Sequence, residues 1–237
     1  MSDDRELAER LASVRLRIAE ACARVGRRLE EVTLVGAAKA QPPARLLAAR
    51  RAGLAVFGEN RVHEAEEHRA LLATDGSNAP EWHLIGPLQS NKAKRAASLF
   101  DAVHSVDREK IARLLDRELA ALGRRIPAFL EVNLGTEESK HGFPPAGLAA
   151  AARPLAALEH LRVVGLMAVP PAADDPGAAR PWFRRLRELA AELAARPEWP
   201  RFPALLSMGM SDDFEVAVEE GATHVRIGSA LFGPRLS

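Results

Sequence analysis

The chain has 237 residues, of which 47% are hydrophobic and 27% charged, and its formal net charge is +1. This balance excludes a disordered chain and shows no global basic bias toward nucleic acid. The single cysteine, Cys22, cannot form an internal disulfide, and residues 1–20 carry charges throughout. We therefore expect a cytoplasmic protein without a signal peptide. No apolar run approaches the ~20 residues of a membrane-spanning helix, which argues against a membrane protein.

Short apolar runs alternate with longer helical patterns along the chain. The first pattern places Leu7, Leu11, Val14 and Ile18 at helical spacing, which predicts an amphipathic N-terminal helix. Strands are then predicted at 32–38, 54–57, 82–85, 102–106, 128–132, 161–167, 204–208 and 223–227. Helices are expected between them, near 43–52, 60–72, 92–99, 108–122, 144–158, 178–195 and 212–220.

Eight strand–helix repeats after one helix predict a parallel (β/α)8 barrel formed by residues 1–237 as a single domain. An open doubly wound sheet is the main alternative. No predicted strand leads into a G-x-G-x-x-G fingerprint or a P-loop, which weakens a nucleotide-binding fold.

Polar or glycine-rich clusters follow several predicted strands on the same side. They are Lys39, 58–60 (GEN), 86–91 (GPLQSN), 207–211 (SMGMS) and 228–229 (GS). In a parallel barrel these strand ends meet at the face that carries the active site, often with a phosphate near strands seven and eight. The sequence therefore favours a ligand with a phosphate, although glycines and serines also form ordinary turns and caps.

Two basic residues stand out within apolar surroundings. Only five of the 33 basic residues are lysine, and Lys39 ends a buried strand, where its amine could form a Schiff base with an aldehyde. Arg226 lies within a predicted strand and needs an acceptor, either a carboxylate or a ring nitrogen. His63 and His68 are five residues apart and would not share a helix face, so no metal site is predicted.

Taken together, these segments resemble the pyridoxal phosphate homeostasis proteins, the YggS/PROSC family. The similarity extends from about Val32 to Arg235 and is carried by long runs. These are 57–62 (FGENRV), 82–92 (WHLIGPLQSNK), 206–213 (LSMGMSDD) and 225–233 (VRIGSALFG).

The resemblance implies a barrel related to the N-terminal, cofactor-binding domain of alanine racemase, which holds pyridoxal 5'-phosphate (PLP). By motif position, Lys39 would form the Schiff base, and Arg226 would face the pyridine nitrogen. The residues implied to hold the phosphate are Ser207, Gly228 and Ser229. Those implied to line the rest of the cofactor are Asn60, His83 and Met208.

The chain departs from the family pattern at two points in this site. Many members have serine before the Schiff-base lysine and a second lysine two residues after it, whereas here Ala38 precedes Lys39 and Gln41 follows. Ser229 stands where threonine is common, which retains the hydroxyl. Lys140 is either a second cofactor contact or a surface charge.

We expect a carrier or regulator of PLP without catalytic turnover. Its partners would be PLP and the PLP-dependent apo-enzymes that receive it, with no nucleic acid, and it would be a monomer or weak dimer.

The alternative is a PLP-dependent racemase or decarboxylase, with His83 or His104 as the second acid or base. The related racemases take a tyrosine from an additional β domain. This chain has no tyrosine and ends about ten residues after the last predicted strand. A lysine-dependent aldolase for a phosphorylated sugar is a third hypothesis.

Overall fold

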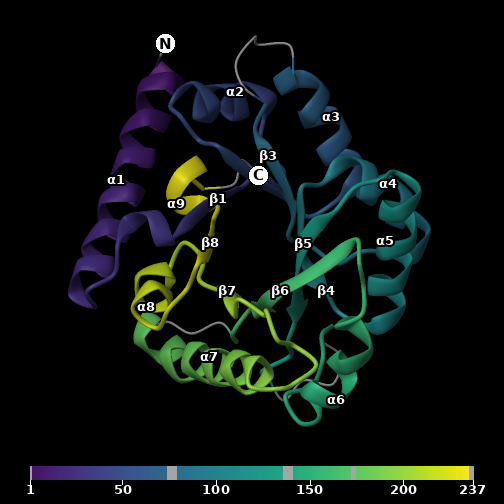
Figure 1. Ribbon diagram of the computed structural model, residues 1–237. Coiled ribbons are helices and arrows are strands. Elements are labelled where there is room, and N and C mark those ends of the chain that lie inside the picture. Colours follow the sequence, from purple (N-terminus) through teal and green to yellow (C-terminus); the bar gives the residue numbers. More distant parts are fainter. Residues whose placement is uncertain (1, 74–78, 136–140, 172–174, 235–237) are drawn as a thin grey trace.

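The computed structural model describes residues 2–73, 79–135, 141–171 and 175–234. Its eight strands are all parallel and close into a barrel in chain order, with β1 paired to β8 (Figure 1). The strands are β1 (Thr33–Ala37), β2 (Val56–Glu59), β3 (Glu81–Leu84), β4 (Ala102–Val106), β5 (Ile126–Glu131), β6 (Leu161–Met167), β7 (Leu205–Ser207) and β8 (His224–Ile227). This confirms the predicted (β/α)8 barrel.

Helices surround the barrel, as Figure 1 shows. Among the described residues they are α1 (Ser2–Arg24), α2 (Pro43–Arg51), α3 (Val62–Leu72), α4 (Ala93–Leu99), α5 (Glu109–Ala121), α6 (Leu148–Ala152), α7 (Arg180–Ala194), α8 (Phe214–Glu219) and α9 (Ser229–Phe232). Helix α1 is the predicted extra N-terminal helix, and it packs against α2, α8 and α9. None of the helices in the described ranges is both long and apolar enough to cross a membrane.

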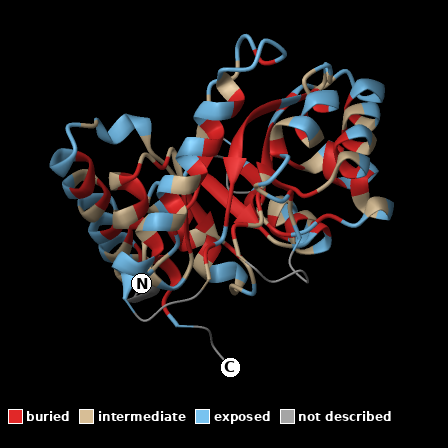
Figure 2. Ribbon diagram, turned by 90° about the horizontal axis from the view of Figure 1, so that it is seen from below, coloured by how far each residue is buried: buried red, intermediate tan, exposed pale blue. Residues whose placement is uncertain are grey.

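Burial follows the two layers of this fold, with the strands inside and the helices outside. Figure 2 shows buried strands at the centre and helices whose outer faces are exposed. In α5, Ile111, Leu115 and Leu119 recur at helical spacing and are fully buried against the strands. Gly165 lets β6 approach β7 closely, because a Cβ there would lie 2.0 Å from the carbonyl oxygen of Leu205.

One predicted helix is much shorter than its sequence pattern suggested. The pattern at 144–158 gives only α6, followed by a 3-10 turn at Arg153–Leu155. Gly147 precedes α6 with a positive φ of 82°, and Pro154 lacks the N–H that a continuous helix needs. The alanine-rich composition favoured a helix, but these two residues limit it to one short piece.

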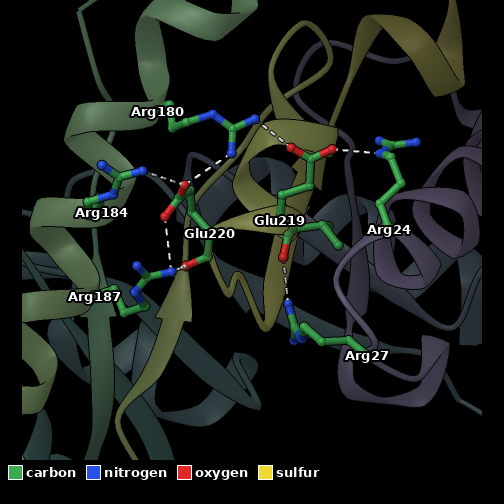
Figure 3. A network of polar contacts seen from close by, with 8 residues as sticks. Arg24, Arg27, Arg180, Arg184, Arg187, Glu219 and Glu220 are labelled. Atoms are coloured by element: carbon green, nitrogen blue, oxygen red, sulfur yellow. Dashed lines mark hydrogen bonds and ion pairs between the residues drawn. The ribbon is translucent and has the colours of Figure 1, made fainter.

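An ion-pair network joins α8 to α1 and α7 near the end of the chain (Figure 3). Glu219 contacts Arg24 at 2.7 Å and Arg180 at 2.5 Å, whereas Glu220 lies 3.0 Å from both Arg180 and Arg187. Hydrogen bonding from Arg180 holds the pKa of Glu219 below its ordinary value. The network thereby anchors the segment that leads into β8.

Candidate functional site

A pocket of about 440 Å³ opens at the carboxyl-terminal ends of the strands. This is the face where barrel enzymes carry their sites. Its lining comes from the ends of six of the strands and the segments that follow them, and consists of Ala37, Lys39, Gln41, Asn60, Ile85, Val169, Met210, Ser211, Asp212, Arg226, Gly228, Ser229 and Gly233. Five of the eight predicted site residues are therefore brought together: Lys39, Asn60, Arg226, Gly228 and Ser229.

Lys39 reaches this pocket from a tight turn that follows β1. The N–H of Gln41 donates to the carbonyl oxygen of Ala38 at 3.0 Å, which closes the turn around Lys39. Ala40 has a φ of 56°, a conformation that favours glycine and costs an alanine about 1 kcal/mol. The turn thus holds the half-buried Lys39 side chain where it lines both this pocket and an adjoining groove.

Arg226 brings a buried positive charge to the floor of the pocket. Its Nη1 donates to the carbonyl oxygen and the hydroxyl of Ser207, at 2.8 and 2.7 Å, and its Nη2 donates to the carbonyl oxygen of Ala168 at 3.0 Å. Burial lowers the pKa of Arg226 to about 10, although the nearby Asp213 and Glu131 carboxylates oppose that shift. The guanidinium therefore stays charged at neutral pH.

Backbone N–H groups and hydroxyls gather where the chain leaves β8. The N–H groups of Gly228 and Ala230 both donate to Ser211 Oγ, each at 3.2 Å. Ser229 lies between them, and its side chain lines the pocket. Convergent backbone donors with adjacent hydroxyls are suited to an anion such as a phosphate group. We call Ser211, Gly228, Ser229 and Ala230 the anion cradle.

Asn60, which follows β2, is fixed at the pocket by close backbone packing. A Cβ on Gly86 would lie 2.6 Å from the carbonyl oxygen of Asn60, so only glycine allows this approach. The preceding residue, Glu59, is fully buried and lies 2.6 Å from Nδ1 of His68 on α3. Burial raises the pKa of the Glu59 carboxyl. Helix α3 and the loop after β3 together hold Asn60 at the pocket.

Three predicted site residues are buried and do not contribute to the lining of the pocket. Among the described residues, His83, Ser207 and Met208 are all at least nine-tenths buried, and none of them lines this pocket. Ser207 Oγ is held inside the barrel by Arg226 and by His104, whose Nδ1 lies 2.7 Å away. Lys140 lies outside the described residues.

Ser211 is the main residue that sequence reasoning missed. The segment 207–211 contains two serines, and the family resemblance implied Ser207 as the phosphate ligand by motif position. In the structure β7 ends at Ser207, whose side chain turns into the barrel, and Ser211 is the serine that reaches the loop after β8. The second serine of this cluster was the available signal.

A groove of about 590 Å³ adjoins the pocket and shares Lys39 and Asn60 with it. Most of its polar lining is basic, and the members that can carry positive charge are Lys39, Arg61, His63, Lys92, Arg108 and His141. Three of these residues already have carboxylate partners, since Arg61 pairs with Glu64, and Arg108 and His141 both contact Asp107. The groove gives the pocket a positively charged approach.

Comparison with known proteins agrees with this geometry. The family model "Alanine racemase, N-terminal domain" matches residues 12–235. Two curated proteins named pyridoxal phosphate homeostasis protein are similar over almost the whole chain. The one from Pseudomonas aeruginosa is 44% identical, covering 97% of this chain and 96% of its own length. The one from Aquifex aeolicus is 42% identical, covering 96% of this chain and 97% of its own.

Solved structures are also similar to this chain. PipY of Synechococcus elongatus, in a structure described as having PLP bound, has a TM-score of 0.84 and 38% identity, covering 96% of this chain and 100% of that one. An alanine racemase of Clostridium difficile has a TM-score of 0.68 at 14% identity, with 98% of this chain and 56% of that one covered. The second similarity concerns the fold alone.

Proposed function

The chain belongs to the pyridoxal phosphate homeostasis proteins, within the family of alanine racemase N-terminal domains, and from this we propose that it binds PLP and acts in PLP homeostasis. The observation that carries the proposal is that one pocket is lined by an amine, a guanidinium and an anion cradle. These groups match an aldehyde, a ring nitrogen and a phosphate, the three polar features of PLP.

Lys39 is the amine that we propose to hold the cofactor covalently. When bound, PLP supplies an aldehyde that an amine can attack to form a Schiff base with loss of water. The turn that closes around Lys39 and the half-buried setting of its side chain restrict the positions of Nζ. A restricted amine loses less conformational entropy when it reacts, which favours retention of the cofactor.

The phosphate is proposed to bind at the anion cradle, where Gly228 and Ala230 can turn their N–H groups from Ser211 Oγ to phosphate oxygens. Ser211 would then remain as a hydroxyl ligand beside Ser229. This proposal replaces Ser207 with Ser211, because the Ser207 hydroxyl is engaged inside the barrel. Asn60 would contact the cofactor from the end of β2.

We propose that the protein carries or regulates PLP without catalytic turnover. A charged Arg226 facing the pyridine nitrogen would keep that nitrogen unprotonated, which weakens the ring as an electron sink. Racemisation also needs a second acid or base at the substrate carbon. The chain has no tyrosine, and the alternatives, His83 and His104, are buried below the pocket.

We further propose that residues 1–237 act as one PLP-binding unit in the cytoplasm, as a monomer or weak dimer, and that PLP-dependent apo-enzymes receive the cofactor. The basic groove beside Lys39 supports this transfer, because an anionic cofactor would leave along a positively charged path.

The proposal is tested by titrating purified protein with PLP and recording the visible spectrum, with Lys39→Ala and Lys92→Ala alongside. Lys92 lines only the neighbouring groove, so it controls for a general loss of positive charge. We expect a new visible band with wild type and Lys92→Ala, and none with Lys39→Ala. L-Alanine and other amino acids are then added. Their conversion would overturn the non-catalytic part of the proposal, and the absence of a band in wild type would overturn PLP binding.

A further inference from the structure

Three histidines occupy the interior of the barrel below the pocket, where aliphatic side chains usually fill the core of this fold. His83 lies on β3, His104 on β4 and His224 on β8. The ring centroids of His83 and His104 are 5.0 Å apart, and those of His104 and His224 are 5.4 Å apart. Within the described part of the chain, no three metal-binding side chains are grouped to hold an ion. The polar contacts of these rings therefore need another explanation.

Two of the histidines belong to a continuous chain of contacts that starts at Arg226. Arg226 Nη1 and His104 Nδ1 each lie 2.7 Å from Ser207 Oγ. His104 Nε2 lies 3.0 Å from Nδ1 of His83, and His83 Nε2 lies 3.4 Å from a carboxylate oxygen of Glu81. Glu81 begins β3, and its side chain is 66% exposed. The chain thus runs from the pocket floor to the opposite end of the barrel.

The two ends of this chain fix the direction of every hydrogen bond within it. A guanidinium can only donate, and an ionised carboxylate can only accept. Ser207 accepts from Arg226 and so donates its hydrogen to Nδ1 of His104. His104 then donates from Nε2 to His83, and His83 donates from Nε2 to Glu81. In this arrangement each ring carries a hydrogen on Nε2 and accepts at Nδ1.

The reverse order is unfavourable at both ends. It would leave the Ser207 hydrogen without its acceptor on His104. With one hydrogen on His83, it would also place a bare ring nitrogen against the Glu81 carboxylate. Burial, reinforced by the neighbouring His83 and His224, holds the pKa of His104 well below its ordinary value, which agrees with a neutral ring. One arrangement of hydrogens therefore dominates.

We propose that His104 and His83 are positioning residues that hold the Arg226 guanidinium at the pocket floor through Ser207. Because the Ser207 hydrogen is committed to His104, an oxygen lone pair of Ser207 always faces Arg226. Two backbone carbonyl oxygens, from Ser207 and Ala168, complete the fixed set of acceptors. A guanidinium held in this way presents the same donors to every ligand that enters the pocket. The role in cofactor binding rests on the proposed PLP function, whereas the hydrogen arrangement does not.

The hydrogen arrangement is tested first, without any ligand, by long-range 1H–15N spectra of protein labelled on its seven histidines. Resonances are assigned with His83→Gln and His104→Gln. At pH 7.5 we expect each ring to carry its hydrogen on Nε2, with a hydrogen-bonded Nδ1. A hydrogen on Nδ1 of His104, or a charged His104, would overturn this hydrogen arrangement.

The positioning role is tested by PLP titration of His104→Asn and His104→Gln. The asparagine amide oxygen can take the place of Nδ1 and accept from Ser207, whereas the glutamine amide reaches toward His83 and leaves Ser207 without this acceptor. We expect His104→Gln to weaken PLP binding by about tenfold, the effect of one lost buried hydrogen bond, and to shift the visible band. His104→Asn should restore most of both properties.

Two further variants separate positioning from a general loss of structure. The double variant His104→Gln with Ser207→Ala should bind PLP no more weakly than Ser207→Ala alone, because both changes break one path. His160→Gln, at a histidine that bonds the Arg124 carbonyl oxygen, is the control and should bind like wild type. A folded His104→Gln with unchanged affinity and spectrum would overturn the positioning role. If wild type bound no PLP, the proposed function would fail, while the histidine spectra would still show whether the proposed hydrogen arrangement is present.

Discussion

The hydroxyl oxygen of Ser211 accepts a hydrogen bond from the backbone N–H of Gly228 at 3.2 Å, which joins the loop after β7 to the loop after β8. Because Ala230 donates to the same oxygen, two backbone donors converge on one point at the pocket wall. A phosphate oxygen that binds beside Ser211 would need only a small turn of these two donors, so little reorganisation would accompany its binding.

Replacing Ser211 with alanine tests this cradle. The variant loses the hydroxyl that we propose as a ligand of the phosphate, so we expect PLP affinity to fall by about tenfold, equivalent to one hydrogen bond. Equilibrium titration in phosphate-free buffer measures the change. Ser98→Ala, at an exposed serine that bonds only the neighbouring Arg95 carbonyl oxygen, should bind PLP like wild type. Equal affinities for the two variants would show that the cradle does not hold the phosphate.

Gly86→Ala tests the packing that fixes Asn60. The added methyl group would lie within 3 Å of three atoms of Asn60, so we expect a loss of about 1–3 kcal/mol in the free energy of unfolding. Urea denaturation measures this change. Gly177→Ala is the control, because neither Gly177 nor Gly86 has a positive φ and the added Cβ would meet only side-chain atoms of the exposed Asp175, at 3.2 Å or more. Equal losses in both variants would contradict a specific effect of the close approach to Asn60.

The buried histidines predict a loss of stability in mild acid. Burial, with the nearby His83 and Arg226, lowers the pKa of His224 from its ordinary 6.5 to about 3. Between these values the unfolded chain binds a proton that the folded chain does not, so stability falls as pH falls. Urea denaturation at pH 6.5 and pH 5 should show about 2 kcal/mol less loss for His224→Gln than for wild type. Identical losses would contradict a neutral His224 in the folded state.

Glu220→Ala tests the network between α7 and α8. The Glu220 side chain is only 6% exposed and contacts Arg180, Arg184 and Arg187, so its removal should cost about 1–3 kcal/mol of unfolding free energy. Glu192→Ala removes an exposed partner of Arg185 and should change stability by less than about 1 kcal/mol. Thermal denaturation of both variants measures the difference. A similar small effect for both would mean that the network adds nothing beyond surface charge pairs.

The strands were predictable because each is a short apolar run bounded by polar or glycine-rich segments. All eight predicted strands overlap the observed ones, and β4 and β6 agree at both ends. The segment 144–158 was harder, since its alanines favour a helix whereas Gly147 and Pro154 limit it. Local composition identified the element but not its length.

Within the site, sequence position predicted which loops meet but not the depth of each side chain. Lys39 and Arg226 were identified because a charged residue in or directly after an apolar strand needs a polar partner or a ligand, and both residues line the pocket. Ser207 was assigned to the phosphate, yet its side chain points into the barrel, where it meets His104. That contact joins residues 103 positions apart in the sequence, so local sequence patterns could not reveal it.

The most direct test of PLP attachment is to reduce the PLP-loaded protein with borohydride and map the modified lysine by peptide mass spectrometry. Reduction converts the carbon–nitrogen double bond into a stable single bond, which marks the amine that formed it. The account predicts that the label lies on the peptide containing Lys39 and disappears in Lys39→Ala. A label on Lys92 or Lys140 in place of Lys39, or no label on any lysine, would contradict the account.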